Sequence, residues 1–244
     1  MMNEIILIRG LFRSKEHWGS FPQQMQNIFP NSIITCVDIP GNGFLFREVS
    51  PYSISNMVEN IRKQRKGKGK AYIFGISMGG MVGLKWAEIY PEEVQSIICI
   101  NTSASSFSRF YHRLRPKNYF RIIKAIFYYP SIKREEVIYK MVSNKPLNKK
   151  IIDEWSNYSK CFPISISNFF RQLLAAKNFS ISKPKCELFF IASKNDNLVN
   201  FKATKAIAEK WNIPVIINKF DGHDIALDNP GWLLNISEII WSQD

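Results

Sequence analysis

Three residues with complementary chemistry lie far apart in the chain, each close behind an apolar run. Ser77 lies in the pattern Gly75-x-Ser77-x-Gly79, Asp196 in "ASKNDNLV" and His223 in "FDGHDIALDNP". A serine hydroxyl is a weak nucleophile until a base accepts its proton, and a histidine base needs an acid that orients its ring. Ser77 as nucleophile, His223 as base and Asp196 as orienting acid would together cleave an acyl bond.

The pentamer around Ser77 is too short to identify a nucleophile by itself, so its surroundings decide. The run "YIFGI" before Ser77 predicts a strand, and "MGGMVGLKWAEIY" after it predicts a helix. Gly75 and Gly79 would let the strand and the helix approach closely, which a sharp turn with an exposed serine requires. The alternative is a glycine-rich strand–helix junction in which the serine is incidental.

The chain has only three histidines, and their positions favour one of them as the base. His17 lies near the first expected helix, where a structural role is the simpler interpretation. His112 lies in a basic segment, where solvent or anion contact is expected. His223 follows the last apolar strand, and loops at the carboxyl edge of a parallel sheet are where such folds place reactive groups.

Asp196 is favoured as the acid because it also follows an expected strand. Asp221 and Asp224 are weaker candidates, since a direct neighbour of His223 cannot easily reach the far ring nitrogen. An ordinary turn residue at 196, and a loop histidine held by Asp221 or Asp224, are the structural alternatives.

Apolar runs alternate with helical patterns over most of the chain, which predicts a parallel α/β sheet with helices on both faces. The expected strands are 4–9, 32–38, 71–76, 94–101, 186–192 and 214–220. The expected helices between and after them are 17–29, 53–65, 78–90, 201–211 and 231–241.

The segment 103–183 breaks this alternation and differs in composition. It holds 16 of the 33 Lys and Arg residues but only 4 of the 20 Asp and Glu residues, and therefore nearly all of the net charge of +13. Its helical patterns, punctuated by prolines, predict a basic helical lid inserted into an α/β core formed by residues 1–102 and 184–244.

Basic and aromatic residues alternate at the start of this segment, which suggests a substrate or partner role. A solvated basic helix whose aromatics seal the lid to the core is one interpretation. The other is an apolar acyl pocket beneath a positive rim that attracts an acidic carrier protein or, second, an anionic membrane. Nucleic acid is unlikely beside a complete triad. The candidate partner-binding residues are Arg109, Arg113, Arg115, Lys117, Arg121 and Lys124.

The residues around the three catalytic candidates resemble the α/β-hydrolase superfamily over essentially the whole chain. "LIRGLFRSKEHW" is similar to the loop after the first core strand, "VDIPGNG" to the loop after the second, and "GHDIALDNP" to the segment of the catalytic histidine. The resemblance implies an α/β-hydrolase fold with a helical lid, and an oxyanion hole formed by the Leu11 and Met78 backbone amides. Arg9 stands where the family usually has histidine. Because that residue shapes the loop and does not react, the resemblance still implies an oxyanion hole here.

Within the superfamily, the frame looks like small serine carboxylesterases, including the pimeloyl-acyl-carrier-protein methyl ester esterases of biotin synthesis. This implies a carboxylic ester hydrolase that needs no cofactor or metal. The alternatives are a carrier-protein-dependent esterase or thioesterase, and a non-catalytic binding protein that uses the same cavity. No stretch is long and apolar enough for a membrane span. The start lacks a secretion signal and the four cysteines are widely spaced, so a cytoplasmic location is expected.

Overall fold

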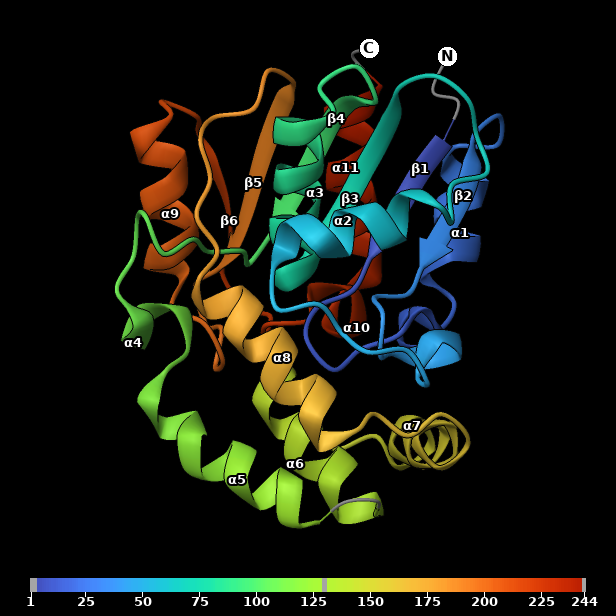
Figure 1. The fold of residues 1–244 in the computed structure, drawn as a ribbon, viewed down its shortest axis with the longest axis vertical. Coiled ribbons are helices and arrows are strands. Elements are labelled where there is room, and N and C mark those ends of the chain that lie inside the picture. Colours follow the sequence, from blue (N-terminus) through green and yellow to red (C-terminus); the bar gives the residue numbers. More distant parts are fainter. Residues whose placement is uncertain (1–3, 129–130, 243–244) are drawn as a thin grey trace.

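The computed structural model describes residues 4–128 and 131–242, which form one sheet, helices on both of its faces and a helical insertion (Figure 1). The sheet order is β2-β1-β3-β4-β5-β6, and every neighbouring pair in it is parallel. The strands are β1 (Glu4–Ile8), β2 (Ile33–Val37), β3 (Ala71–Ile76), β4 (Val94–Ile100), β5 (Glu187–Ser193) and β6 (Val215–Asn218).

The central strands are apolar on both faces because helices cover both. Every residue of β1 and β3 is buried, which explains why their sequences run without polar alternation. In register, Ile8 of β1 lies beside Gly75 of β3, and Ile76 of β3 lies beside Ile100 of β4. The ends of these three strands therefore lie together at one edge of the sheet.

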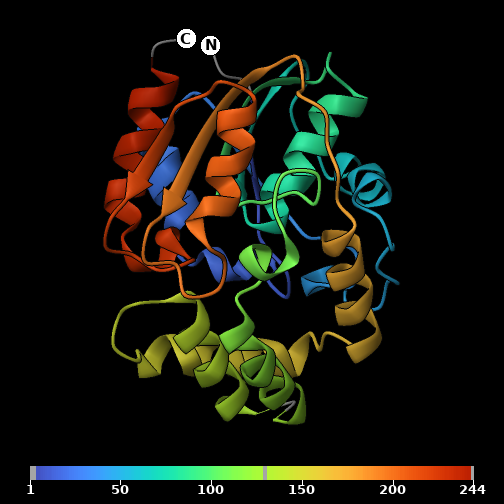
Figure 2. The ribbon, with the colours of Figure 1, turned by 90° about the vertical axis from the view of Figure 1, so that its left-hand side faces the viewer.

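Two sets of helices enclose the sheet, as the sequence predicts (Figure 2). One face is covered by α1 (Phe21–Ile28) and α11 (Pro230–Trp241). The other is covered by α2 (Ile54–Arg62), α3 (Met78–Ile89) and α9 (Phe201–Lys210). The helix expected over 17–29 is interrupted, because a 3-10 turn, η1 (Lys15–Trp18), ends at Gly19, whose φ of 55° no helix continues.

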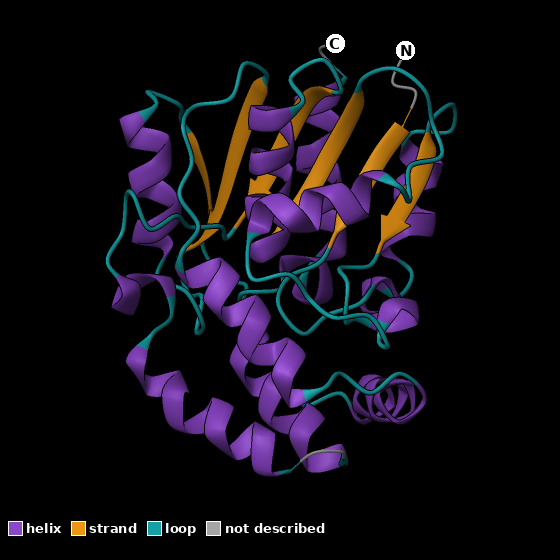
Figure 3. Ribbon diagram, viewed as in Figure 1, coloured by secondary structure: helices purple, strands orange, loops and turns teal. Residues whose placement is uncertain are grey.

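The segment between β4 and β5 is helical and lies beyond the carboxyl ends of the strands (Figures 1 and 3). Its own small core joins three of these helices and includes Ile138, Tyr139, Ile152 and Trp155. The helices are α4 (Phe110–Arg113), α5 (Tyr119–Phe127), α6 (Ile132–Val142), α7 (Lys149–Cys161) and α8 (Ile166–Lys177). We call residues 103–183 the insertion.

Two features of the described residues bear on the sequence expectations. None of their helices is long and apolar enough to span a membrane. All four cysteines are free thiols: Cys99 is buried, Cys36 and Cys186 are half-buried, and Cys161 on α7 is exposed.

Candidate active site

Ser77 occupies a sharp turn between β3 and α3. Its backbone has φ 57° and ψ −117°, a conformation that non-glycine residues rarely adopt, and its N–H donates to the Ile100 carbonyl at 2.8 Å. Such strain persists only where the surroundings hold it and is concentrated at functional sites. The turn projects the Ser77 side chain beyond the sheet edge, beneath the insertion.

The glycines around Ser77 are needed for this turn, as the sequence suggests. A Cβ at Gly79 would lie 2.1 Å from the Ile8 carbonyl oxygen, and one at Gly75 would lie 2.6 Å from the Gly79 backbone. Neither neighbour can move away, because both belong to the main chain of the sheet or of α3. The elbow therefore forms only with glycine at both positions.

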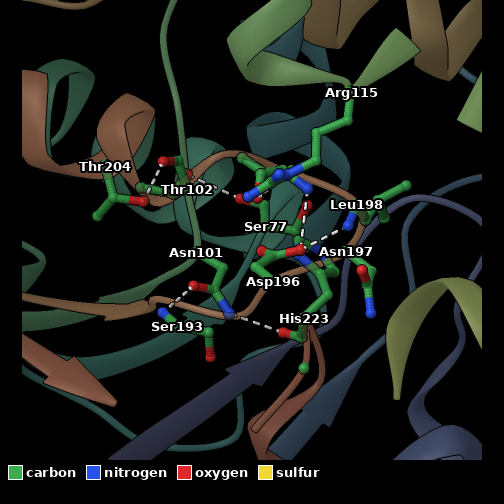
Figure 4. Close-up of polar contacts among 12 residues, drawn as sticks. Ser77, Asn101, Thr102, Arg115, Ser193, Asp196, Asn197, Leu198, Thr204 and His223 are labelled. Atoms are coloured by element: carbon green, nitrogen blue, oxygen red, sulfur yellow. Dashed lines mark hydrogen bonds and ion pairs between the residues drawn. The ribbon is translucent and has the colours of Figure 1, made fainter. Parts of the chain in front are cut away.

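Asp196 and His223 meet at the same edge of the sheet (Figure 4). The Asp196 Oδ2 atom lies 2.7 Å from His223 Nδ1, and its Oδ1 accepts hydrogen bonds from the Leu198 and Val199 amides at 2.7 and 2.9 Å. Both side chains are buried, at 6% and 1% exposure for histidine and aspartate. With Nδ1–H donating to the carboxylate, Nε2 of a neutral ring is left as the proton acceptor.

Asp221 and Asp224 do not take this place. Asp221 accepts from the Asn218 side-chain amide at 2.7 Å, and Asp224 pairs with Arg9. The preference for Asp196 over its two rivals, drawn from their places in the sequence, agrees with this geometry.

Asn101 is a part of the site that the sequence reasoning missed. It directly follows β4 with φ 49°, and its Nδ2 donates to the His223 carbonyl at 2.8 Å while its Oδ1 accepts from the Ser193 amide at 2.7 Å (Figure 4). It thus fastens the histidine loop to the end of β5. The available signal is an asparagine directly after a buried strand, since asparagine tolerates left-handed backbone.

The Leu11 and Met78 amides are free to bind an oxyanion. Neither N–H donates a hydrogen bond to any residue in the ranges 4–128 and 131–242, and both residues line the cavity that holds Ser77. The Met78 amide is also the first of α3, where unpaired N–H groups attract negative charge.

A single cavity joins these groups. It has an empty volume of about 1380 Å³, including solvent at its mouth, and Ser77 and His223 both line it. Apolar side chains of α5, α6 and α8 in the insertion form a large part of its wall. They include Ile122, Ile126, Ile138, Met141, Phe169 and Leu173.

Comparison with known proteins identifies this architecture. A family model described as the alpha/beta hydrolase fold matches residues 5–119. The chain has an α/β-hydrolase fold. The fold expected from the sequence resemblance, a parallel sheet with helices on both faces, is confirmed.

Several solved structures share the fold at low sequence identity. A proposed lipase, Lip1, from Acinetobacter baumannii AYE is 18% identical, with a TM-score of 0.78 over 99% of this chain and 84% of that one. An esterase from Exiguobacterium antarcticum is 15% identical, with a TM-score of 0.76 over 99% and 92%. A membrane phospholipase A described as a bacterial virulence factor is 15% identical, with a TM-score of 0.75 over 99% and 79%. No curated protein matches the sequence of this chain.

Arg9, which departs from the α/β-hydrolase pattern, is built into the loop by an ion pair. Its Nη1 donates to Asp224 Oδ1 at 3.1 Å, its Nη2 bonds the other carboxylate oxygen, and its guanidinium lies 4.6 Å from the Trp18 ring centroid. Burial raises the pKa of Asp224, but the charge of Arg9 and its hydrogen bond outweigh burial, and the net pKa is lowered. The pair joins the Leu11 loop to the residue after His223.

A second anchor joins the histidine loop of the hydrolase fold to the insertion. Asp228, in the short helix α10 (Ile225–Asp228), accepts from the Gly222 amide at 2.7 Å, from the Asn144 amide at 2.9 Å and from the Ser143 hydroxyl. The Asp224 amide also donates to the Val142 carbonyl at 2.8 Å. These hydrogen bonds fasten the end of α6 to the histidine loop.

The structure corrects the expected positive rim at Arg113. This side chain is buried, its Nη1 donates to the Lys177 carbonyl at 2.7 Å, and its Nη2 bonds the Ala176 carbonyl. Burial lowers its pKa to about 10. Arg113 therefore caps the carboxyl end of α8 and is not available to a partner. The basic composition of the surrounding segment does not reveal that this side chain is buried.

Of the other basic candidates, two contact the loop of Asp196 and three lie at the surface. Arg115 is half-buried, with its amide donating to the Leu198 carbonyl at 2.9 Å, and the Lys117 ammonium donates to Asn197 Oδ1 at 2.6 Å. Both therefore support the loop of Asp196. Arg109 and Lys124 are exposed and Arg121 is half-exposed.

His17 and His112 lie apart from the triad candidates, as expected. His17 is buried, takes a hydrogen bond from the Ser14 amide at 3.1 Å, and packs on Trp155 and Tyr158 of the insertion. His112 is half-buried and its ring contacts Tyr111.

Proposed function

We propose that this protein hydrolyses carboxylic esters through Ser77, His223 and Asp196. The observation that carries the proposal is the buried Asp196–His223 hydrogen bond at the wall of the cavity that also holds the Ser77 elbow. Ester cleavage is also the chemistry named for the esterase and the lipase that share this fold.

The proposed reaction proceeds through an acyl-enzyme. His223 Nε2 takes the proton of the Ser77 hydroxyl as its oxygen attacks the ester carbon, and the Leu11 and Met78 amides stabilise the negative oxygen that forms. The imidazolium, held by Asp196, returns the proton to the leaving alcohol. A water molecule then attacks the acyl-serine by the same proton transfers and releases the acid.

The cavity favours an apolar acyl group. Aliphatic and aromatic side chains of the insertion surround Ser77, so a hydrocarbon chain bound there is removed from water. We expect kcat/KM for p-nitrophenyl esters to rise from acetate to a medium-length chain, by about fourfold for each added methylene, from the transfer free energy of such a group.

The decisive experiment compares wild type with Ser77→Ala. Ester turnover should fall by about 10⁶-fold, as for triad serines elsewhere, and labelling by a fluorophosphonate should be lost. Ser103→Ala is the matched control, since Ser103 also lines the cavity, and it should keep labelling and turnover. Turnover by Ser77→Ala near that of wild type would refute the mechanism, and absence of labelling in wild type would favour the non-catalytic binding protein.

A carrier-bound acyl ester or thioester is the second candidate substrate. The exposed Arg109 and Lys124 favour it, because an acidic carrier would be attracted to them. The variant Arg109→Glu/Lys124→Glu should then lose turnover of carrier-bound esters and keep turnover of small soluble ones. If the variant turns over carrier-bound esters as fast as the wild type does, these two residues do not bind a carrier protein.

A further inference from the structure

Helix α5 of the insertion exposes an apolar stripe to solvent. Phe120 is 74% exposed, Ile123 is 49% exposed and Phe127 is 82% exposed. Their spacing of three and four places them on one face of the helix, while Ile122, Ala125 and Ile126 line the cavity. Two protruding phenylalanines on one short helix are costly in water, which indicates that this face is covered by a partner.

Helix α8, the other wall of the cavity, repeats the arrangement. Ile166, Phe170 and Leu174 recur every four residues and are 50%, 53% and 40% exposed, whereas Phe169 and Leu173 line the cavity. Among the described cavity residues only Phe110, Ile166 and Lys177 are exposed, so the cavity meets solvent along α8 and beside α4. The mouth is therefore bordered by exposed apolar side chains.

The charge of these helices is of one sign. Residues 103–134 and 166–177 contain no aspartate or glutamate. Exposed lysines accompany the apolar residues: Lys124 lies within the α5 stripe, Lys133 lies near the start of α6, and Lys177 lies at the mouth. Apolar residues beside lysines are the composition of a helix that lies in the surface of an anionic bilayer.

We propose that α5 docks this protein on an anionic lipid surface. Phe120, Ile123 and Phe127 enter the boundary between headgroups and acyl chains, and the lysines contact the phosphates. A second copy of this chain fits poorly, because it would bring basic faces together. An acidic protein would meet the lysines but would leave the protruding phenylalanines without an apolar environment.

The exposed apolar residues of α8 border the cavity mouth, so docking that extends from α5 to α8 would place this mouth at the membrane. An ester of a lipid could then enter the cavity through this mouth and reach Ser77 without crossing water. This delivery step rests on the proposed ester hydrolysis, whereas the docking itself does not.

Vesicle binding of the Ser77→Ala protein tests the docking without hydrolysis. We expect it to sediment with vesicles rich in phosphatidylglycerol, to bind phosphatidylcholine vesicles far less, and to be released by salt. The double variant Phe120→Ser/Phe127→Ser should weaken binding by about 100-fold, from the burial of two phenylalanines, and Lys124→Glu/Lys133→Glu should weaken it only on anionic vesicles.

A matched pair of isoleucines controls for general surface effects. Ile123→Ser on α5 should reduce vesicle binding, whereas Ile239→Ser on α11, 52% exposed in the wild type, should not. Equal binding by wild type and the phenylalanine variant, or equal effects of the two isoleucine variants, would overturn the proposal. So would binding to an acidic carrier protein with no binding to vesicles.

Turnover separates docking from catalysis. With Ser77 intact, the phenylalanine variant should hydrolyse soluble esters as the wild type does and lose turnover of esters carried in anionic vesicles. Loss of both activities would contradict the docking proposal, and vesicle binding without any ester turnover would instead refute the proposed function alone.

Discussion

The sheet with its helices and the insertion distribute their apolar residues differently. In the sheet, Ile5 and Ile73 are fully buried, and helices cover both sides of every central strand. In the insertion, apolar residues face a small core, the cavity and solvent at once, and Phe120 and Phe127 protrude. The sheet fixes the positions of reactive groups, while the insertion offers surfaces that a substrate and a partner can occupy.

After that of Ser77→Ala, the largest expected effect lies in the sheet region, at Asp196. Asp196→Asn should lower kcat for a small soluble ester by about 10⁴-fold, because the amide no longer holds the His223 ring in the required tautomer. Asp221→Asn, in the histidine loop but without contact to the ring, is the control and should stay within tenfold. A comparable loss of kcat in both variants would show that activity depends on the structure of the loops and not on the Asp196 carboxylate.

The next effect lies in the insertion, at Arg113. Replacement by methionine removes charged hydrogen bonds to the last carbonyls of α8 and should lower the free energy of unfolding by about 2–3 kcal/mol. Urea unfolding measures this. Arg109→Met, which removes an exposed cation from the same stretch, should change it by less than about 0.5 kcal/mol. Equal losses of unfolding free energy in the two variants would show that the buried arginine contributes no more to stability than the exposed one.

His17 lies between the two regions, and its burial predicts that the stability of the fold depends on pH. Burial, and then the charges of Arg13 and Arg9, hold its pKa well below the ordinary value, so the folded protein keeps the ring neutral. The unfolded chain binds a proton near pH 6.5. Stability is therefore complete above about pH 6.5 and is lost as the pH falls, by about 1.4 kcal/mol at about pH 5.5.

His17→Gln isolates this contribution. The drop in unfolding free energy between about pH 7.5 and about pH 5.5 should be smaller in the variant by about 1.4 kcal/mol. His112→Gln, at a half-buried histidine of the insertion, is the matched control. An identical pH dependence in wild type and His17→Gln would exclude the buried ring as the cause.

The smallest expected effect is at the protruding face of the insertion. Phe127→Ser should leave the free energy of unfolding within about 0.5 kcal/mol of wild type, because the ring already lies in water. Thermal unfolding measures this. A loss of several kcal/mol would show that Phe127 packs within the protein and would remove it from the docking face.

The sequence predicts the sheet region well because a continuous apolar run fits only one structure there, a strand buried on both faces. A run such as "AYIFGI" can be buried only where helices cover both sides, and strands of one direction bring Ser77, Asp196 and His223 to one edge. The elbow glycines are also readable, since Gly79 has a backbone neighbour that excludes any side chain.

The insertion is less predictable because its patterns permit several arrangements. Helix α5, "YFRIIKAIF", is apolar on most of its circumference, so periodicity does not reveal that Phe127 faces solvent and Ile126 the cavity. The burial of Arg113 depends on where α8 ends, a contact made across 63 residues of sequence. Asn101 was missed for a related reason, because its partners, the end of β5 and the loop of His223, are distant in the sequence.

The contacts of Asp228 constrain how the cavity can change shape. They fasten the segment after α6 to the loop of His223, while Arg113 fastens α4 to the end of α8. The carboxyl end of α5 and the start of α6 lie away from these two fixed points (Figure 1). Displacement of these two helix ends would widen the cavity for a bulky acyl group while His223 stays in place.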